Sequence, residues 1–176
     1  STVEGKPVIG PLINEKIELK TYPVVTTTWG EWRKQHSDTQ VLSLNTGHKR
    51  DYAEGEAYKN YFNNDNLMFP VPQLDRRLKN KDEVFVIRSN GYNDDPVAIA
   101  VKYLKKKKWY QGKIGDNRFV VVSDDSGAAR AYLINNIEFN SYKGAELVDN
   151  KGSRWSVQEE CLTSDDGQKL DRLSGH

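Results

Sequence analysis

The sequence predicts a mainly β protein (β-rich α+β), in which short antiparallel strands form a barrel-like or sandwich sheet with one or two short helices. Two observations predict this class. Short apolar or alternating runs recur along the chain, and Gly, Asn and Asp separate them at close intervals, as is typical of sandwiches and barrels. Only one strong helix-start signal is present, at Thr28.

The composition fits a folded chain without a strong charge bias. The chain has 176 residues, with 26 Lys and Arg against 25 Asp and Glu. This balance argues against a general nucleic-acid-coating protein, which needs a basic excess. The apolar runs are far shorter than the ~20 residues that cross a bilayer, so no transmembrane segment is expected. Phosphate-loop, dinucleotide and zinc-protease motifs are absent from the sequence, so no cofactor and no metal are predicted.

One short helix is expected in the first half of the chain, over residues 29–36. Thr28 can accept a hydrogen bond from a backbone N–H of the first turn, and Glu31 can reach back, as in a capping box. Trp29 and Trp32 then lie on one face of the helix. We expect this face to form the seam between the helix and the sheet.

The rest of the first half carries weaker signals. Residues 16–20 alternate polar and apolar, and residues 40–44 read as a second short strand. Residues 45–66 hold few aliphatic residues but many Asn, Gly and aromatic residues. We expect a long ordered loop there, pinned by its aromatic side chains, with one helical turn around residues 58–62.

The second half carries the main sheet. Residues 118–123 and 128–134 flank Asp124-Asp125-Ser126-Gly127, which predicts a β-hairpin. The next turn predicts that residues 137–139 extend this hairpin to a three-stranded meander. Trp155 is expected in the core. Further strands are predicted at residues 83–88, 96–101, 145–148 and 154–157.

We predict one β-rich domain over residues 1–176, and an internal similarity indicates that it is the later part of a duplicated unit. Residues 1–4, 10–12 and 16–19 resemble residues 156–159, 166–167 and 169–173 in order and spacing. In this interpretation, residues 1–25 end one copy and residues 83–173 form the second. A partner protein, or a missing part of the same chain, would then supply the rest of the first copy.

Several strings of residues share a pattern with a known family, and the most specific of them is Thr-Gly-x-x-Arg-Asp-Tyr at residues 46–52. The other matching strings are residues 28–32, 36–43, 69–71, 74–78, 81–84 and 152–156. Through these strings, essentially the whole chain resembles a large family of uncharacterised bacterial proteins, catalogued as a domain of unknown function. The resemblance implies an exported protein in the periplasm or at the cell surface. It also implies an upstream half with a paired-cysteine motif in fuller members, and no activity, substrate or cofactor.

The segment after Gly47 is the candidate site. Arg50 can bind a carboxylate or phosphate, and His48 with Asp51 can work as a general-base pair. The structural alternative is that Arg50 and Asp51 hold the loop through pairs with residues such as Asp75, Arg76 or Arg77. The residues assigned to binding are Arg50, Tyr52, His48, Lys49, Asp75 and Trp32, and His48 and Asp51 are the catalytic candidates.

Two further features are interpreted as structural. Residues 102–113 interleave lysines with aromatic residues, as a single-stranded nucleic-acid or sulfated-glycan groove does, but a solvated run is the commoner outcome. A nucleic-acid partner is therefore not predicted. Cys161 is the only cysteine, which excludes an intrachain disulfide and a multi-cysteine metal site.

Together these features predict a non-enzymatic binding or assembly module of the bacterial envelope. It would present the loop at residues 45–62 to a partner protein or a glycan. The alternative is a hydrolase or other acid–base enzyme that uses His48, Asp51 and Arg50.

Overall fold

The structure is a computed structural model and describes residues 2–3, 5–19, 22–53, 55–88 and 96–173. The described part is mainly β with three short helices, which confirms the predicted class and adds a helix to it. The elements in chain order are β1 (Thr2–Val3), β2 (Lys6–Pro7), α1 (Trp29–Gln35), α2 (Lys59–Phe62), β3 (Val84–Ile87), β4 (Val97–Ala100), α3 (Val101–Lys107), β5 (Trp109–Ile114), β6 (Asn117–Ser123), β7 (Ala129–Leu133), β8 (Phe139–Lys143), β9 (Glu146–Asp149), β10 (Arg154–Val157), β11 (Cys161–Ser164) and β12 (Lys169–Leu173).

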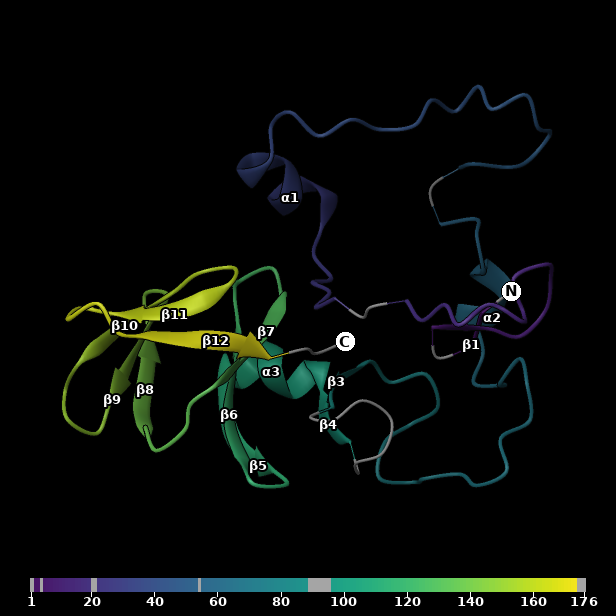
Figure 1. Ribbon diagram of the computed structural model, residues 1–176. Helices are drawn as coiled ribbons and strands as arrows, with labels where there is room; N and C mark the ends of the chain where they lie inside the picture. The colour runs from purple at the N-terminus through teal and green to yellow at the C-terminus, as the bar shows by residue number, and fades with distance from the viewer. Residues whose placement is uncertain (1, 4, 20–21, 54, 89–95, 174–176) are drawn as a thin grey trace.

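An eight-stranded antiparallel sheet is the centre of the molecule, with the strand order β5-β6-β7-β12-β11-β10-β9-β8. Its two edge strands approach each other. The backbone N–H of Phe139 in β8 donates a 3.1 Å hydrogen bond to the Gln111 side chain in β5. The sheet is therefore a nearly closed barrel, with β8 and β5 on the two sides of the gap (Figure 1).

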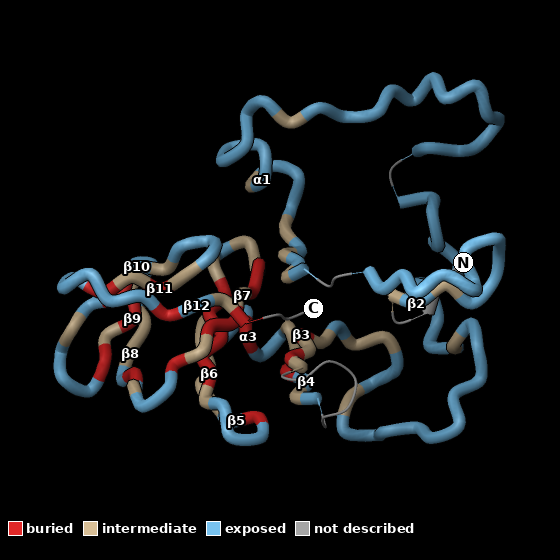
Figure 2. The backbone as a smooth tube through the Cα atoms, in the orientation of Figure 1, coloured by how far each residue is buried: buried red, intermediate tan, exposed pale blue. Residues whose placement is uncertain are grey.

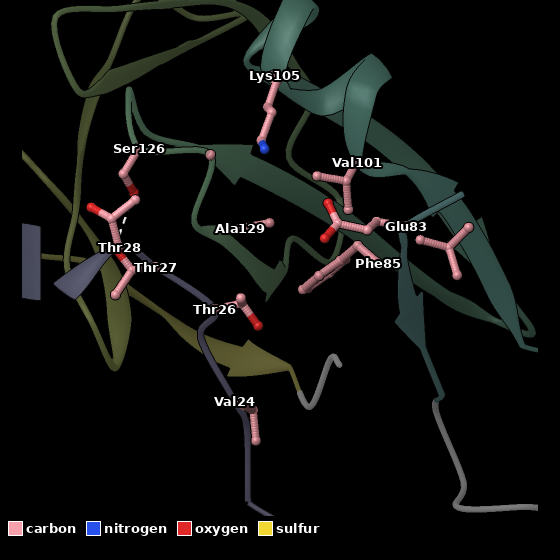
Figure 3. Close-up of a pocket in the computed structure, with 12 residues that line it drawn as sticks. Val24, Thr26, Thr27, Thr28, Glu83, Phe85, Val101, Lys105, Ser126 and Ala129 are labelled. Carbon is pink, nitrogen blue, oxygen red and sulfur yellow. Dashed lines mark hydrogen bonds between the residues drawn. The ribbon is translucent and has the colours of Figure 1, made fainter. Parts of the chain in front are cut away.

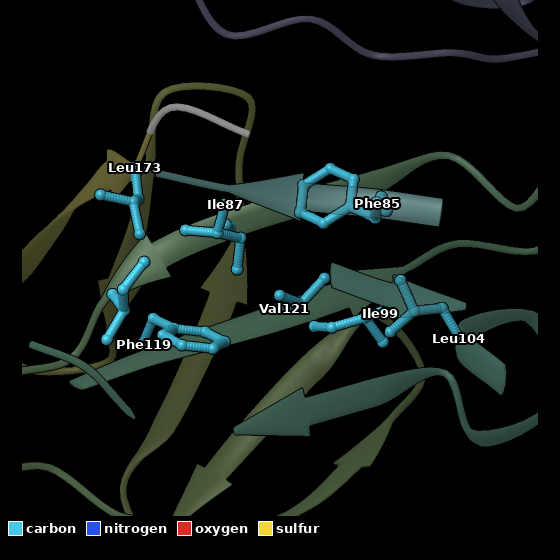
Figure 4. Close-up of a cluster of buried hydrophobic side chains, with 10 residues drawn as sticks. Phe85, Ile87, Ile99, Leu104, Phe119, Val121 and Leu173 are labelled. Carbon is cyan, nitrogen blue, oxygen red and sulfur yellow. The ribbon is translucent and has the colours of Figure 1, made fainter. Parts of the chain in front are cut away.

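The barrel has two hydrophobic clusters because strand β6 is buried on both faces. Val120 and Val122 belong to one cluster, together with the fully buried ring of Trp155. Phe119 and Val121 point the opposite way and join the other cluster, which β3, β4 and α3 cover (Figure 4). A strand covered on both sides reads as a continuous apolar run, as residues 119–122 do. The expectation that Trp155 lies in the core is confirmed.

Three hairpin turns of the barrel share one hydrogen-bonding pattern. In each turn, a side-chain oxygen of the first residue accepts a hydrogen bond from the backbone N–H of the fifth, at 3.1, 2.9 and 2.8 Å. The fourth residue is a glycine with φ of +88°, +89° or +86°, a conformation that other L-residues adopt at a cost. The turns comprise residues 124–128, 149–153 and 164–168.

Several sequence predictions are confirmed in their placement. The helix expected over residues 29–36 is α1, and Thr28 accepts a 3.3 Å hydrogen bond from Glu31 N at its N-terminus. The turn expected around residues 58–62 contains α2, and the predicted hairpin is formed by β6 and β7. The strand predictions at residues 83–88, 96–101, 145–148 and 154–157 correspond to β3, β4, β9 and β10.

Other predictions are wrong. Residues 16–19 and 40–44 form no strand, and Lys20, the end of the first predicted run, lies outside the described residues. The predicted three-stranded meander is also wrong, because β7 pairs with β12 and β8 pairs with β9. By contrast, the interpretation of a solvated lysine run is consistent with the structure, because Lys105, Lys106 and Lys107 are exposed on helix α3.

Residues 22–80 form a long segment outside the barrel, which we call the arm. Figure 2 shows that the arm is exposed along almost its whole length, whereas the buried residues gather in the barrel and in the elements that cover it. Among the described residues, every buried hydrophobic side chain lies between Phe85 and Leu173. The prediction that Trp29 and Trp32 form the seam between the helix and the sheet is therefore wrong, since the two residues are 51% and 40% exposed. None of the helices in the described ranges is long and apolar enough to cross a membrane.

Candidate functional site

The predicted site loop lies in the arm, and its contacts are local. The hydroxyls of Thr46 and Tyr52 are 2.8 Å apart, and the Thr46 hydroxyl also accepts from His48 N at 3.3 Å. The Asp51 carboxylate accepts a 2.9 Å hydrogen bond from Ala53 N, which is a local Asx turn. Residues 45–53 are all exposed.

Asp75 and Trp32, the other predicted binding residues, belong to separate local arrangements. Arg77 donates to both carboxylate oxygens of Asp75, and the side-chain and backbone hydrogen bonds from Arg77 lower the pKa of Asp75 to about 2. The Trp32 indole N–H donates a 2.9 Å hydrogen bond to Thr39 Oγ1, and its ring stacks on His36 at 3.9 Å.

The structure does not bring the predicted site residues together. Within the described ranges, no hydrogen bond or ion pair joins the loop at residues 45–52 to Asp75 or Trp32, and none is made by the side chain of Lys49 or Arg50. Asp75 pairs with Arg77 instead of Arg50. A binding role for these residues stays a prediction.

The arm exposes a large amount of apolar surface. All of the large hydrophobic residues that are exposed in the described part of the chain, except Tyr103, lie either in the arm or in residues 8–19 before it, and most of them lie in the arm. Leu42 is 92% exposed and Phe69 is 72% exposed. Single exposed apolar residues are normal on a protein surface, but a concentration of this kind marks an interaction site.

The arm crosses the barrel at residues 24–28. Thr27 Oγ1 lies 3.1 Å from Ser126 Oγ in the turn between β6 and β7. The Ser126 hydroxyl donates to Asp124 at 2.6 Å, so it accepts its hydrogen bond from Thr27. Although desolvation raises the pKa of Asp124, hydrogen bonds from Ser126 and Arg130 outweigh it and hold the pKa below its usual range.

A cleft of about 360 Å³ lies where the arm meets the barrel (Figure 3). Its lining includes Phe85, Val101 and Ala129, with threonine hydroxyls of the arm beside them. Figure 3 shows that the charged groups of Glu83 and Lys105 both point toward the cleft, that of Lys105 from helix α3. Its size and mixed lining fall within the range of small-ligand sites, about 300–1,000 Å³.

Gly127 allows Lys105 to reach the cleft. A Cβ atom at Gly127 would lie only 2.4 Å from Lys105 Cε and 3.2 Å from its Cγ. The stem of Lys105 therefore runs directly over the turn, and Gly127 has φ +88°.

A second attachment of the arm lies at its C-terminal end. The Lys81 ammonium donates to the backbone carbonyls of Tyr61 and Asn64, and it lies 4.0 Å from the centroid of the Tyr61 ring. Asn80 Nδ2 donates to Asp65 O at 3.0 Å. These contacts tie helix α2 and the residues after it to the segment that enters β3. Within the described ranges, no group of three or more His, Cys, Asp or Glu could hold a metal ion.

No local sequence pattern predicts the cleft. Its lining comes from residues 24–28, 83–85, 101–105 and 126–129, which are far apart in the chain. Ser126 and Gly127 were recognised as a hairpin turn, but nothing local indicates that Thr27 would lie against that turn. The contact depends on how the arm passes over the barrel.

The fold and these surfaces define a class of protein: a nearly closed antiparallel β-barrel with a long exposed apolar arm. The chain belongs to the family described as protein of unknown function (DUF3179), whose sequence model matches residues 1–176. No curated protein and no solved structure matches the chain.

Proposed function

We propose that this protein is a binding and assembly module of the bacterial envelope and that the arm binds a partner protein. The single observation that carries the proposal is the concentration of exposed apolar side chains in the arm, beside a barrel whose own hydrophobic side chains are buried. Partner binding would remove this surface from water, at roughly 25 cal/mol per Å² of apolar area. The envelope location rests on the family resemblance.

A protein partner fits the arm better than a glycan does. Sugars bind by stacking on aromatic rings with polar groups around them, whereas aliphatic residues such as Val41, Leu42 and Leu44 are among the most exposed of the arm. An extended segment with exposed aliphatic and aromatic side chains is typical of a surface that a partner protein covers.

The acid–base alternative has less support. The Asp51 carboxylate is engaged by the backbone of Ala53, and no hydrogen bond joins the side chains of His48 and Asp51 in the described part of the chain. The cleft of about 360 Å³ is lined by residues other than these. The geometry therefore does not place His48 and Asp51 as a paired acid and base beside this cleft.

The test uses a photo-crosslinking amino acid placed at Leu42 or Phe69 of the full chain in cells. The matched control carries the same amino acid at Asp116, which is fully exposed on the barrel. We expect one discrete adduct from both arm positions and none from the control. A second substitution, Leu44→Asp, should reduce the adduct from Leu42 by about tenfold, because a charge at the contact opposes its burial.

The chemical nature of the adduct decides the partner class. An adduct that protease removes from the crosslinked chain supports the proposal. An adduct that resists protease but is cleaved by periodate identifies a glycan and contradicts it. Equal labelling at Leu42 and Asp116 would also contradict it, since the arm would then have no preferred partner.

A further inference from the structure

The first strands of the chain repeat the pairing of the last strands of the barrel. In the β1–β2 hairpin, Thr2 pairs with Pro7. In the β10–β11 hairpin, Val157 pairs with Leu162, and these two residues lie 155 positions further along the chain than Thr2 and Pro7. The two partners are five positions apart in both pairs, so the hairpins share the same register.

A third segment continues the correspondence. Leu19 N donates to Gly5 O at 2.9 Å, and Arg172 N donates to Glu160 O at 3.1 Å. Gly5 and Glu160 are also 155 positions apart, and the shared hydrogen bond makes Leu19 equivalent to Arg172, which lies 153 positions further along. The segment ending at Leu19 therefore occupies the place of β12, after a connection that is two residues longer.

The cross-strand neighbours agree with this alignment. Lys6 Nζ lies 4.0 Å from a Glu18 carboxylate oxygen, and the equivalent residues Cys161 and Asp171 are paired in the barrel. A Cβ atom at Gly5 would lie 2.8 Å from Leu19 O, so glycine allows the close approach of the third segment. Residues 2–19 thus reproduce the arrangement of β10, β11 and β12.

The two units differ in what covers them. In the barrel, Leu162 and Leu170 are 0% and 7% exposed. The residue equivalent to Leu170 is Ile17, which keeps an apolar side chain but is 39% exposed, and the next apolar residue, Leu19, is 57% exposed. The face that is covered by the rest of the barrel in one unit is therefore open in the other.

We infer that residues 2–19 are the closing strands of a second barrel of the same kind. The surface that carries Ile17 and Leu19 binds an antiparallel β-meander with the side-chain pattern of β5–β9. The occupant is a meander because those strands complete the sheet around β10–β12 in the barrel. This surface is separate from the arm, so the inference goes beyond the proposed function and does not depend on it.

The alignment defines the experiment, because Val157 corresponds to Thr2. In the fused protein, a second copy of residues 108–156, which carries β5–β9 and most of β10, is placed directly before Thr2 of the full chain. Thr2 then follows residue 156 of the added copy, as Val157 does in the barrel. We expect backbone amides within residues 2–19 to exchange hydrogen at least about tenfold more slowly in the fused protein than in the parent chain.

Two matched variants of the fused protein test the face. Ile17→Asp places a charge on the face that corresponds to Leu170, and we expect it to abolish the added protection. Lys16→Asp places the same charge at the position of exposed Lys169, and we expect it to leave the protection unchanged. Unchanged exchange of residues 2–19 after fusion would overturn the inference, as would equal effects of the two variants.

A second copy of the chain is the other possible occupant. Sedimentation velocity of the parent chain over a hundredfold concentration range tests it. Self-association that Ile17→Asp abolishes and Lys16→Asp preserves would assign the face to a second copy and overturn the meander. The meander is supported if the parent chain stays monomeric and the amides of residues 2–19 exchange more slowly in the fused protein. Neither result changes the crosslinks expected from Leu42 and Phe69.

Discussion

Asp149 is a nearly buried carboxylate, only 5% exposed, that organises the turn between β9 and β10. Its oxygens accept hydrogen bonds from the Trp155 indole N–H at 3.0 Å and from the backbone N–H groups of Lys151 and Ser153, both at 2.9 Å. Desolvation raises the pKa of Asp149, but these donors outweigh it and hold the pKa below its usual value. The carboxylate therefore links the turn to the ring in the barrel core.

Replacing this carboxylate should destabilise the barrel. We expect Asp149→Ala to lower the free energy of unfolding by about 2–3 kcal/mol, because the buried indole N–H of Trp155 and the backbone donors lose their acceptor. Urea denaturation followed by tryptophan fluorescence measures the change. Asp116→Ala, at a fully exposed position, is the control and should have no measurable effect. Equal midpoints for the two variants would contradict the role of Asp149.

Glu159 connects two arginines of the sheet. Arg130 Nε donates to Glu159 at 2.8 Å, and Arg172 also donates to its carboxylate. The Arg172 side chain is 7% exposed. Desolvation raises the pKa of Glu159, but the hydrogen bonds and charges of Arg130 and Arg172 outweigh it and lower the pKa below the ordinary value of 4.5.

This shift predicts a pH dependence of stability. Because the folded pKa of Glu159 is lowered, the unfolded chain binds the proton more readily in acid. The stabilisation is complete above pH 4.5, the ordinary value, and is lost as the pH falls through the lowered folded value. We expect the difference in unfolding free energy between the parent chain and Glu159→Gln to shrink between pH 5 and pH 3. A difference that stays constant over this interval, in urea denaturation, would exclude the effect.

For the candidate site, the sequence predicts which residue types lie in one segment but not which distant residues they contact. The sequence places His48, Arg50 and Asp51 in one segment, and in the structure this segment is exposed. Whether Arg50 meets Asp75 depends on the path of the arm, and Asp75 instead pairs with its sequence neighbour Arg77. Short-range hydrogen bonds follow from sequence spacing, whereas contacts over long loops do not.

At the scale of the elements, the three related hairpin turns are the best defined feature. In each turn the first side chain binds the backbone that follows, and the fourth residue is a glycine with positive φ. The sequence predicts the Asp124 turn because apolar runs flank its Asp and Gly residues. The turns therefore fix which strands are neighbours within each hairpin.

Gly152 offers a clean test of this turn, because no atom lies within 4 Å of a Cβ built on it. We expect Gly152→Ala to lower the free energy of unfolding by about 1–2 kcal/mol, since φ +89° is strained for an L-residue. Thermal or urea denaturation measures the loss. Gly30→Ala in helix α1 is the control, because its Cβ also meets nothing and its φ is not positive. Destabilisation of equal size at both sites would argue against strain at Gly152.

The prediction of strand neighbours is wrong where the local sequence pattern favours one pairing and the closed sheet has another. Residues 137–139 follow β7 after a tight turn, yet β8 pairs with β9, and β12 takes the place beside β7. The lysine run after residue 101 forms α3 because Leu104 is fully buried and the lysines lie around it. Pairing between distant strands is set by closure of the sheet, which no short window of sequence contains.

At the scale of the whole molecule, the barrel and the arm differ in burial. Every buried hydrophobic side chain in the described ranges lies after residue 84, and the arm touches the barrel through residues such as Thr27. The prediction of one domain over residues 1–176 stays a prediction. Its test is whether the barrel depends on the arm.

We expect a chain that starts at residue 82 to unfold cooperatively, with an unfolding free energy within about 1 kcal/mol of the full chain. The physical reason is that none of the buried hydrophobic residues in the described ranges lies in the removed part, which comprises the arm and the residues before it. Urea denaturation of the two chains under the same conditions provides the comparison. A larger loss, or a broad transition, would show that the arm is part of one folding unit with the barrel.

The sequence alone determined the mainly β class, helix α1, the hairpin around Asp124 and the similarity between the two ends of the chain. These features depend on alternation, capping and turn chemistry within a few residues, which local sequence contains. Only the tertiary structure decided the order of strands in the barrel, the cleft beneath Thr27 and the exposure of Trp29 and Trp32. Each of these depends on which distant segments meet, and that is set by the packing of the whole sheet rather than by any one stretch of residues.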